Sequence, residues 1–355
     1  MNNESLNIQN TPFEFRGNAS DFFQIWFVNT IFTVITFGIY GAWAKVRNNR
    51  YIYSNTFLGN HPFEYTANPV KILIGRLIVV GIYAAFFIAS ELMFIGAAAI
   101  IFIIFIFLIP LIIRQSLIFN AKYTRFHGLN FRYRASVGDF YKFFLFHTFL
   151  NLITIGIIFP YTHSEFKKLV INHTYYGNSN FYFQSQAPQF FFIYYVKIML
   201  LYVVLFVVVV LSTVALLAIT RTGIEELNNG GVLIILGTIS LMLYFGVIIF
   251  SFILRGSFEA WIGRVVYNNT SIKEYRMLNE WNAFKLSWIY LSNFFVIIVS
   301  LGLLYPWTKI RTVKYKLENI GFENLNLNTF DGQIEQDRSA VGEEAADFFD
   351  FDIGF

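Results

Sequence analysis

The chain contains 355 residues, of which 56% are apolar, 20% are aromatic and only 14% are charged. This composition, with a mean hydropathy of +0.54, excludes a protein that is globular in water. The formal net charge is +4, but the basic residues flank apolar segments and form no dense basic cluster, so no nucleic-acid partner is expected. The chain has no cysteine, which excludes disulfides and thiolate chemistry.

Residues 1–12 form a polar amino-terminal tail that lacks the basic region and cleavage site of a signal peptide. Apolar and charged residues then alternate at 13–16, which predicts a short strand on the polar side of the membrane. The first apolar segment covers residues 22–44 and is long enough to cross about 30 Å of hydrocarbon. A basic helix at 45–53 and two short strands around a turn at 55–65 are predicted to follow.

This succession occurs three times. When Gly38, Gly156 and Gly302 are aligned, the copies match without gaps, which indicates internal repeats. The repeats cover about residues 13–65, 131–183 and 277–329. The three glycines are expected either to bend each apolar segment or to allow close helix contact.

Two further pairs of apolar segments separate the repeats, and each pair is predicted to form a helical hairpin. The hairpins cover about residues 70–114 and 190–255, within a membrane domain at 13–327. The sequence therefore predicts an all-α polytopic membrane protein. It would have four to seven transmembrane helices, built from three internal repeats and two helical hairpins, with short strands on the polar side.

Two topologies are open. Seven spans require the middle repeat to be inverted, as in many transporters, and the length of the apolar segments favours them. Four spans, with the repeat segments re-entrant or interfacial, leave only Arg221 among the lysines and arginines outside, and the positive-inside rule favours them. We prefer seven spans, because a helix break at membrane depth needs protein cover.

The composition changes at residue 328, where an acidic tail begins that contains a single arginine. Residues 328–355 are predicted to be disordered. The tail ends in alternating acidic and aromatic residues that would either dock on a protein partner or only aid solubility.

Several motifs resemble those of the YjgN-like bacterial inner-membrane proteins, a family of unknown function. They are Phe15-Arg16-Gly17, Thr36-Phe37-Gly38-Ile39-Tyr40, Trp43-Ala44-Lys45-Val46-Arg47, and Tyr51 with Asn55-Thr56. The resemblance covers about residues 13–327 and implies a multi-pass protein of the bacterial cytoplasmic (inner) membrane. It implies no activity and no catalytic residues. The second repeat departs from the pattern, with Tyr161 and His163 in place of tryptophan and lysine.

Polar residues in the three apolar repeat segments fall on one helical face, which we call the polar stripe. They are Asn29, Thr33 and Thr36 in the first copy, His147, Asn151 and Thr154 in the second, and Asn293 and Ser300 in the third. Such a face must contact protein or water. The stripes either converge on a polar path or binding site, where His147 would change charge near neutral pH, or form hydrogen bonds between helices.

Basic residues after the first and third apolar segments are candidate contacts for anionic lipids. They are Lys45, Arg47, Arg50, Lys309, Arg311 and Lys314. Trp43 and Trp307 beside them match interfacial anchors. The bilayer itself is the expected partner, and the oligomeric state stays open.

No enzyme motif is present: there is no P-loop, His-Glu-x-x-His, Gly-x-Ser-x-Gly or dinucleotide fingerprint. The five histidines lack metal-ligand spacing, and neither a metal nor a cofactor is expected. The leading prediction is a non-enzymatic membrane protein that binds or transports a small solute or lipid through its repeat-built core. The alternative is a membrane scaffold that recruits a partner through its acidic aromatic tail.

Overall fold

The structure is a computed structural model that describes residues 10–91, 95–221 and 229–325. The predicted acidic tail and residues 1–9 of the polar tail lie outside the described residues. The chain forms two compact bodies. The first comprises Met1–Ser185, Val266–Asn279 and Tyr305–Phe355, and the second comprises Gln186–Val265 and Glu280–Leu304.

Over the described residues, two helices followed by two strands recur five times, and we call each such group a module. The helices are α1 (Ala19–Ile35), α2 (Gly41–Ser54), α3 (Pro69–Glu91), α4 (Ile95–Tyr123), α5 (Val137–Ile153), α6 (Phe159–Asn172), α7 (Ala187–Arg221), α8 (Asn229–Asn268), α9 (Ala283–Val299) and α10 (Tyr305–Glu318). The strands are β1 (Asn10–Phe15), β2 (Thr56–Leu58), β3 (His61–Tyr65), β4 (Thr124–Phe126), β5 (Leu129–Tyr133), β6 (Thr174–Tyr176), β7 (Ser179–Phe183), β8 (Thr270–Ile272), β9 (Tyr275–Asn279) and β10 (Ile320–Glu323). In the fifth module the amino-terminal strand β1 supplies the second strand.

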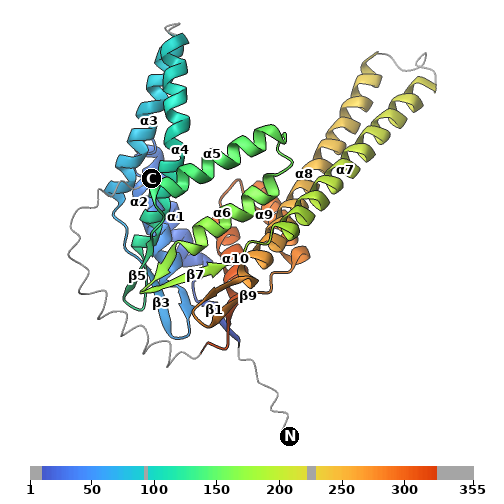
Figure 1. Cartoon of the computed structure of the whole chain (residues 1–355). Coiled ribbons are helices and arrows are strands. Elements are labelled where there is room, and N and C mark those ends of the chain that lie inside the picture. Colours follow the sequence, from blue (N-terminus) through green and yellow to red (C-terminus); the bar gives the residue numbers. More distant parts are fainter. Residues whose placement is uncertain (1–9, 92–94, 222–228, 326–355) are drawn as a thin grey trace. The chain divides into compact units, whose positions relative to one another are not determined.

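All ten strands lie in the first body and form a closed antiparallel barrel (Figure 1). Strand β1 closes it by pairing with β2 on one side and with β10 on the other. Only glycine fits at position 321 of this seam, because a methyl group there would lie 2.5 Å from the backbone oxygen of Thr11. The prediction of an all-α protein is therefore wrong. Strands of three to six residues carry too little periodicity to reveal a barrel from sequence.

Apolar side chains fill the barrel. The ring centroids of Phe13, Phe63, Phe131 and Phe181, on alternate strands, lie 5.9, 6.5 and 6.3 Å apart in succession around the barrel. Alternate strands are separated by about 9.6 Å, so these rings converge toward the barrel axis. Their partners on the intervening strands are also apolar: Leu58 pairs with Phe13, Phe126 with Phe63, and Tyr176 with Phe131. The barrel is thus a packed core.

The five modules share the same local pattern at the start of the first helix. The fourth residue of the first helix in each module is apolar, and its side chain is 0 or 1% exposed. These anchors are Phe22, Ile72, Phe140, Phe190 and Leu286. In the first four modules a threonine that begins the next strand bonds back to the helix carbonyl four residues earlier, at 2.7 to 2.8 Å; these are Thr56, Thr124, Thr174 and Thr270. The five modules are therefore structural repeats.

In the first body, hydrophobic clusters above the barrel join each module to the preceding one. Phe140 of the third module packs with Tyr133 and Leu117, which belong to β5 and α4 of the second module. Phe22 of the first module packs with Phe15 of β1 and Ile310 of α10, both from the fifth module. Within the first body, these clusters join helices of neighbouring modules.

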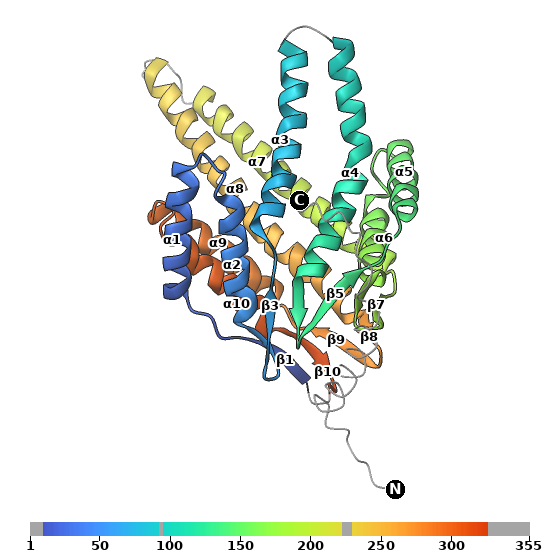
Figure 2. The same cartoon turned by 90° about the vertical axis from the view of Figure 1, so that its left-hand side faces the viewer.

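The three short hairpins share one turn, shown for α1 and α2 in Figure 2. The residue before each glycine is apolar and has positive φ, at 49° in Phe37, 52° in Ile155 and 50° in Leu301, and the glycine follows with φ of 78 to 91°. The glycine N–H donates to the carbonyl five residues earlier, at 2.7 to 2.8 Å. This is a Schellman-type helix end, and glycine is needed because its backbone is left-handed. The open space around the glycines shows that they do not mediate close helix contact.

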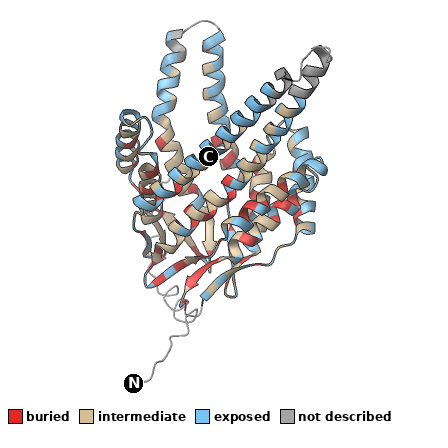
Figure 3. Cartoon of the chain, turned by 90° about the vertical axis from the view of Figure 1, so that its right-hand side faces the viewer, coloured by how far each residue is buried: buried red, intermediate tan, exposed pale blue. Residues whose placement is uncertain are grey.

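Four helices, α3, α4, α7 and α8, are long and apolar enough to cross a membrane. Figure 3 shows that their outer parts are largely exposed, and few residues in their apolar windows are buried, as expected for helices that meet lipid. The short apolar helices α1, α5 and α9 have 17 residues each, about 25 Å, which is less than the hydrocarbon thickness. The four long helices favour four spans over the preferred seven, because each apolar repeat segment ends in a turn before a second helix begins.

Candidate functional site

The polar stripe of the first repeat lies against the second helix of its own hairpin. Asn29 is buried on α1, and its Nδ2 donates to Asn48 Oδ1 of α2 at 3.1 Å. The Thr33 hydroxyl donates to the Asn29 carbonyl oxygen at 2.6 Å. The stripe thus joins α1 to α2.

The second stripe makes the equivalent connection. Asn151 Nδ2 donates to the His147 carbonyl oxygen at 2.7 Å and to Thr162 Oγ1 of α6 at 2.8 Å. The His147 ring lies between the rings of Phe143 and Tyr161, with centroids 4.2 and 5.7 Å away, and its Nδ1 is 2.9 Å from the Phe143 carbonyl oxygen. An aromatic environment thus surrounds His147.

The last residue of each stripe stabilises the hairpin turn. The hydroxyls of Thr36, Thr154 and Ser300 donate to the carbonyl four residues earlier at 2.7 to 2.8 Å. The same oxygens accept the N–H four residues later, at 3.0 to 3.5 Å. In the third copy, Asn293 is buried on α9.

Three polar atoms of the first two stripes are buried without a hydrogen-bond partner. They are Asn29 Oδ1, His147 Nε2 and Asn151 Oδ1. An unpaired buried polar atom costs about 1 to 3 kcal/mol, so each of these atoms can accept a polar ligand or water. The hydrogen bonds inside each hairpin therefore leave these three acceptor atoms available to a ligand or water.

The structure brings the six candidate lipid contacts onto two neighbouring helices. Tyr51 and Ile52 of α2, with Val313 and Leu317 of α10, pack on the same cluster around Phe22. Helix α2 carries three basic residues and no acidic one, and α10 carries four basic residues and one acidic one. A strong excess of positive charge thus lies on adjacent helices of the first body.

Most of these basic side chains are exposed and weakly held. Arg47 donates to the Tyr40 hydroxyl at 3.0 Å, Arg311 lies over the Trp307 ring at 5.2 Å, and Lys314 is 3.8 Å from Glu318. Arg50 Nη2 is 3.4 Å from the Ala67 carbonyl oxygen. Burial, and then the nearby positive charge of Arg76, lowers the pKa of Lys45. Because contacts of this kind are weak, these side chains can turn toward an anionic group.

Sequence reasoning missed an acid–aromatic cluster in the second body. The Tyr290 hydroxyl donates to Glu259 Oε2, and Arg255 lies over the Tyr290 ring at 5.5 Å. Glu259 looks isolated in the sequence because its partner lies 31 residues away, on α9. Among the described residues, no group of three or more His, Cys, Asp or Glu side chains is arranged to hold a metal.

The chain matches the family described as "Bacterial protein of unknown function (DUF898)" over residues 10–348. Inner membrane protein YjgN of Salmonella typhimurium is 34% identical over 139 residues, which are 39% of this chain and 35% of that protein. The Escherichia coli K12 protein of the same name is 25% identical over 156 residues, 43% of this chain and 39% of that protein. The matched region thus spans less than half of these relatives, and no solved structure matches the chain.

The named relatives and the four long apolar helices confirm the predicted location, a multi-pass protein of the bacterial inner membrane. They also confirm the resemblance noted from the repeat motifs. Since the match covers nearly the whole chain, this protein belongs to the DUF898 family of bacterial proteins of unknown function.

Proposed function

We propose that this protein binds anionic phospholipids of the inner membrane through the basic helices α2 and α10. The observation that carries the proposal is the net positive charge of these two neighbouring helices, which together carry seven basic residues and one acidic residue. Basic groups near anionic headgroups contribute about 1 kcal/mol each. A lipid ligand also agrees with a barrel in which aromatic side chains converge toward the axis.

The tips of the short hairpins support the same proposal. Phe37, Ile155 and Leu301 are 92 to 98% exposed and adopt left-handed backbone, which disfavours non-glycine residues by about 1 to 2 kcal/mol. Exposed apolar residues at such turns fit insertion into a leaflet. With the barrel on the cytoplasmic side, the excess of lysine and arginine follows the positive-inside rule.

The test is lipid retention by the full-length protein purified in mild detergent. Native mass spectrometry should find phosphatidylglycerol retained in preference to phosphatidylcholine when the two are supplied equally. The variant Lys309→Gln/Lys314→Gln should lose part of this preference.

A matched control removes two charges from exposed ion pairs of the barrel, Arg16→Gln/Arg125→Gln. It should retain phosphatidylglycerol as the wild type does. Equal retention of both lipids by the wild-type protein would refute the proposal.

A second candidate function is passage of a small polar solute, which the unpaired atoms of Asn29, His147 and Asn151 favour. Flux into vesicles that contain the wild type would be compared with flux through an Asn29→Leu/His147→Leu/Asn293→Leu variant. Unchanged flux in a folded variant removes the polar stripe from any transport mechanism.

A further inference from the structure

We propose that Arg76, Lys45 and the groove between α3 and α4 form a site for one anionic phospholipid. The headgroup phosphate would lie between the two cations, and an acyl chain would lie in the groove. This inference rests on the proposed lipid-binding function and adds a defined, stoichiometric site to it.

The two cations come from different helices of the first body. Arg76 lies in the second turn of α3, and its guanidinium covers the start of α2: a methyl group on Gly41 would be 2.9 Å from Arg76 Nη1. Lys45 stands four residues after Gly41, on the same side of α2. Burial, and then the positive charge of Arg76, lowers the pKa of Lys45, which agrees with the closeness of the two cations. Two cations thus share one small region.

No acidic side chain compensates these charges among the residues that the structure describes. The contrast with Lys71, one turn earlier on α3, is informative, because Lys71 Nζ donates to the Tyr123 hydroxyl at 2.9 Å. Likewise Arg114 on α4 donates to the Ala135 carbonyl oxygen at 2.8 Å. Arg76 is an exposed arginine in an apolar, membrane-crossing helix and makes no such bond to the described residues. An arginine in this setting calls for an anionic partner.

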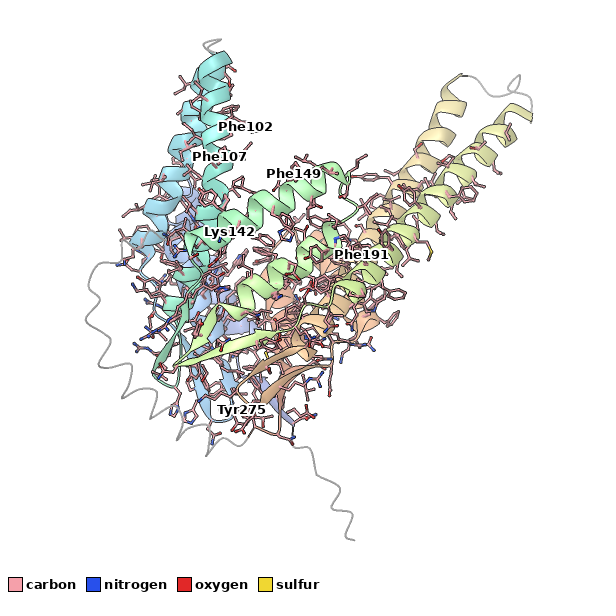
Figure 4. The ribbon with its side chains drawn as sticks, viewed as in Figure 1. Phe102, Phe107, Lys142, Phe149, Phe191 and Tyr275 are labelled. Carbon is pink, nitrogen blue, oxygen red and sulfur yellow. The ribbon has the colours of Figure 1, made fainter. Side chains whose placement is uncertain are left out.

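The groove continues from Arg76 away from the barrel. Its wall on α3 includes Val79, Val80 and Tyr83, which follow Arg76 by three, four and seven residues and therefore share its face. Phe102 and Phe105 of α4 form the other wall, and the volume is about 440 Å³. Figure 4 shows Phe102 on the outer part of the α3–α4 hairpin. An all-apolar groove whose wall on α3 starts one helical turn beyond Arg76 is complementary to a lipid with an anionic headgroup, and not to free phosphate or a polar solute.

The experiment titrates phosphatidylglycerol into the detergent-purified full chain and counts bound lipids by native mass spectrometry. Phosphatidylcholine and inorganic phosphate are titrated separately. The wild type should show one phosphatidylglycerol that binds more tightly than the rest. Arg76→Gln should weaken this first binding step about tenfold, since hydrogen bonds to a charged group are lost.

A second variant keeps both charges. Gly41→Val displaces the guanidinium from its place over α2 and should also weaken the first binding step. Arg125→Gln removes a charge from the barrel and should leave that step unchanged, and thermal unfolding checks that each variant is folded.

The outcomes separate the two proposals. If Arg76→Gln and Gly41→Val bind the first phosphatidylglycerol as the wild type does, the defined site is refuted while the general preference for anionic lipid stands. Inorganic phosphate that displaces the lipid at equal concentration would refute the role of the groove. A wild type without any preference for phosphatidylglycerol refutes both proposals.

Discussion

The short and long hairpins of this protein share a base and differ in what lies above it. Helix pairs α5–α6 and α7–α8 both start from a barrel strand, both bury an anchor four residues after the first helix's cap position, and both return to the barrel through a threonine that bonds to its own helix. Yet α5 ends after 17 residues at a glycine turn, whereas α7 continues for 35 residues. The two kinds of hairpin therefore begin and end in the same way at the strands. The position of the glycine turn sets how far the short hairpins extend from the barrel.

The largest effect is expected when the buried anchor residue is truncated in one short and one long hairpin. Phe140→Ala and Phe190→Ala each remove a fully buried ring and should each lower the free energy of unfolding by about 3 to 5 kcal/mol. Graded SDS titration in mixed micelles measures the loss. A loss confined to one of the two variants would show that the short and long modules are built differently.

Barrel closure is tested next, at the seam that both kinds of hairpin depend on. Gly321→Val forces a side chain against the backbone of Thr11 and Pro12 and should cost about 1 to 3 kcal/mol. Cysteines introduced as Thr11→Cys and Phe322→Cys, which are paired residues, should form a disulfide less readily in this variant. Gly81→Val, at an open helical position, is the control and should leave the disulfide yield unchanged.

The role of the glycine turn is tested by replacing glycine with alanine at two positions, where opposite changes in the free energy of unfolding are expected. Gly156→Ala places a side chain at φ +78° in a short hairpin and should destabilise by about 1 to 2 kcal/mol. Gly81→Ala lies within helix α3, where a side chain meets open space, and should stabilise by up to about 1 kcal/mol. Unfolding in mixed micelles measures both. Effects of the same sign would contradict the assignment of depth to the turn.

The smallest expected effect is a pH dependence of stability that only the second short hairpin should show, because it has a histidine where the other two have a lysine. His163 occupies the position of Lys45 and Lys309, but burial, and then the charge of Lys167, lowers its pKa to about 4. Between its ordinary value of 6.5 and about 4, the unfolded chain binds a proton that the folded chain does not, so stability falls as pH decreases. With a discount for partial exposure, the loss is roughly 1 kcal/mol.

Unfolding of the wild type and of His163→Gln would be compared at pH 7 and near pH 4.5. The variant should lose less stability over this interval. Equal losses would show that His163 is protonated in the folded protein.

The repeats could be predicted from sequence where a local signal exists. Gly38, Gly156 and Gly302 each mark a turn, so alignment on them revealed the three short modules. The same alignment did not include the long modules, because α3 and α7 continue as helices for 23 and 35 residues without a matching glycine motif. A constant spacing of seven residues from the last strand residue to the anchor, as from Tyr65 to Ile72 or from Tyr133 to Phe140, is the signal that unites all five.

Features that depend on residues distant in the sequence could not be predicted in this way. Nothing near Asn10 or Ile320 indicates that their strands pair. The partners of the polar stripe, Asn48 and Thr162, lie on the second helix of their hairpins. A single membrane span over each repeat segment gives no reason to pair them with the stripe. Whether the stripe and the basic helices are functional stays a prediction.

The pairing of β1 with β10 sets an order of events during synthesis. The first strand to leave the ribosome must wait for the last, about 310 residues later, which takes roughly 15 to 60 s at bacterial elongation rates. Throughout that interval the nascent chain carries two unsatisfied sheet borders, one on β1 and one on the growing end. Premature termination before residue 320 therefore leaves a product whose ring cannot close and whose free borders invite aggregation.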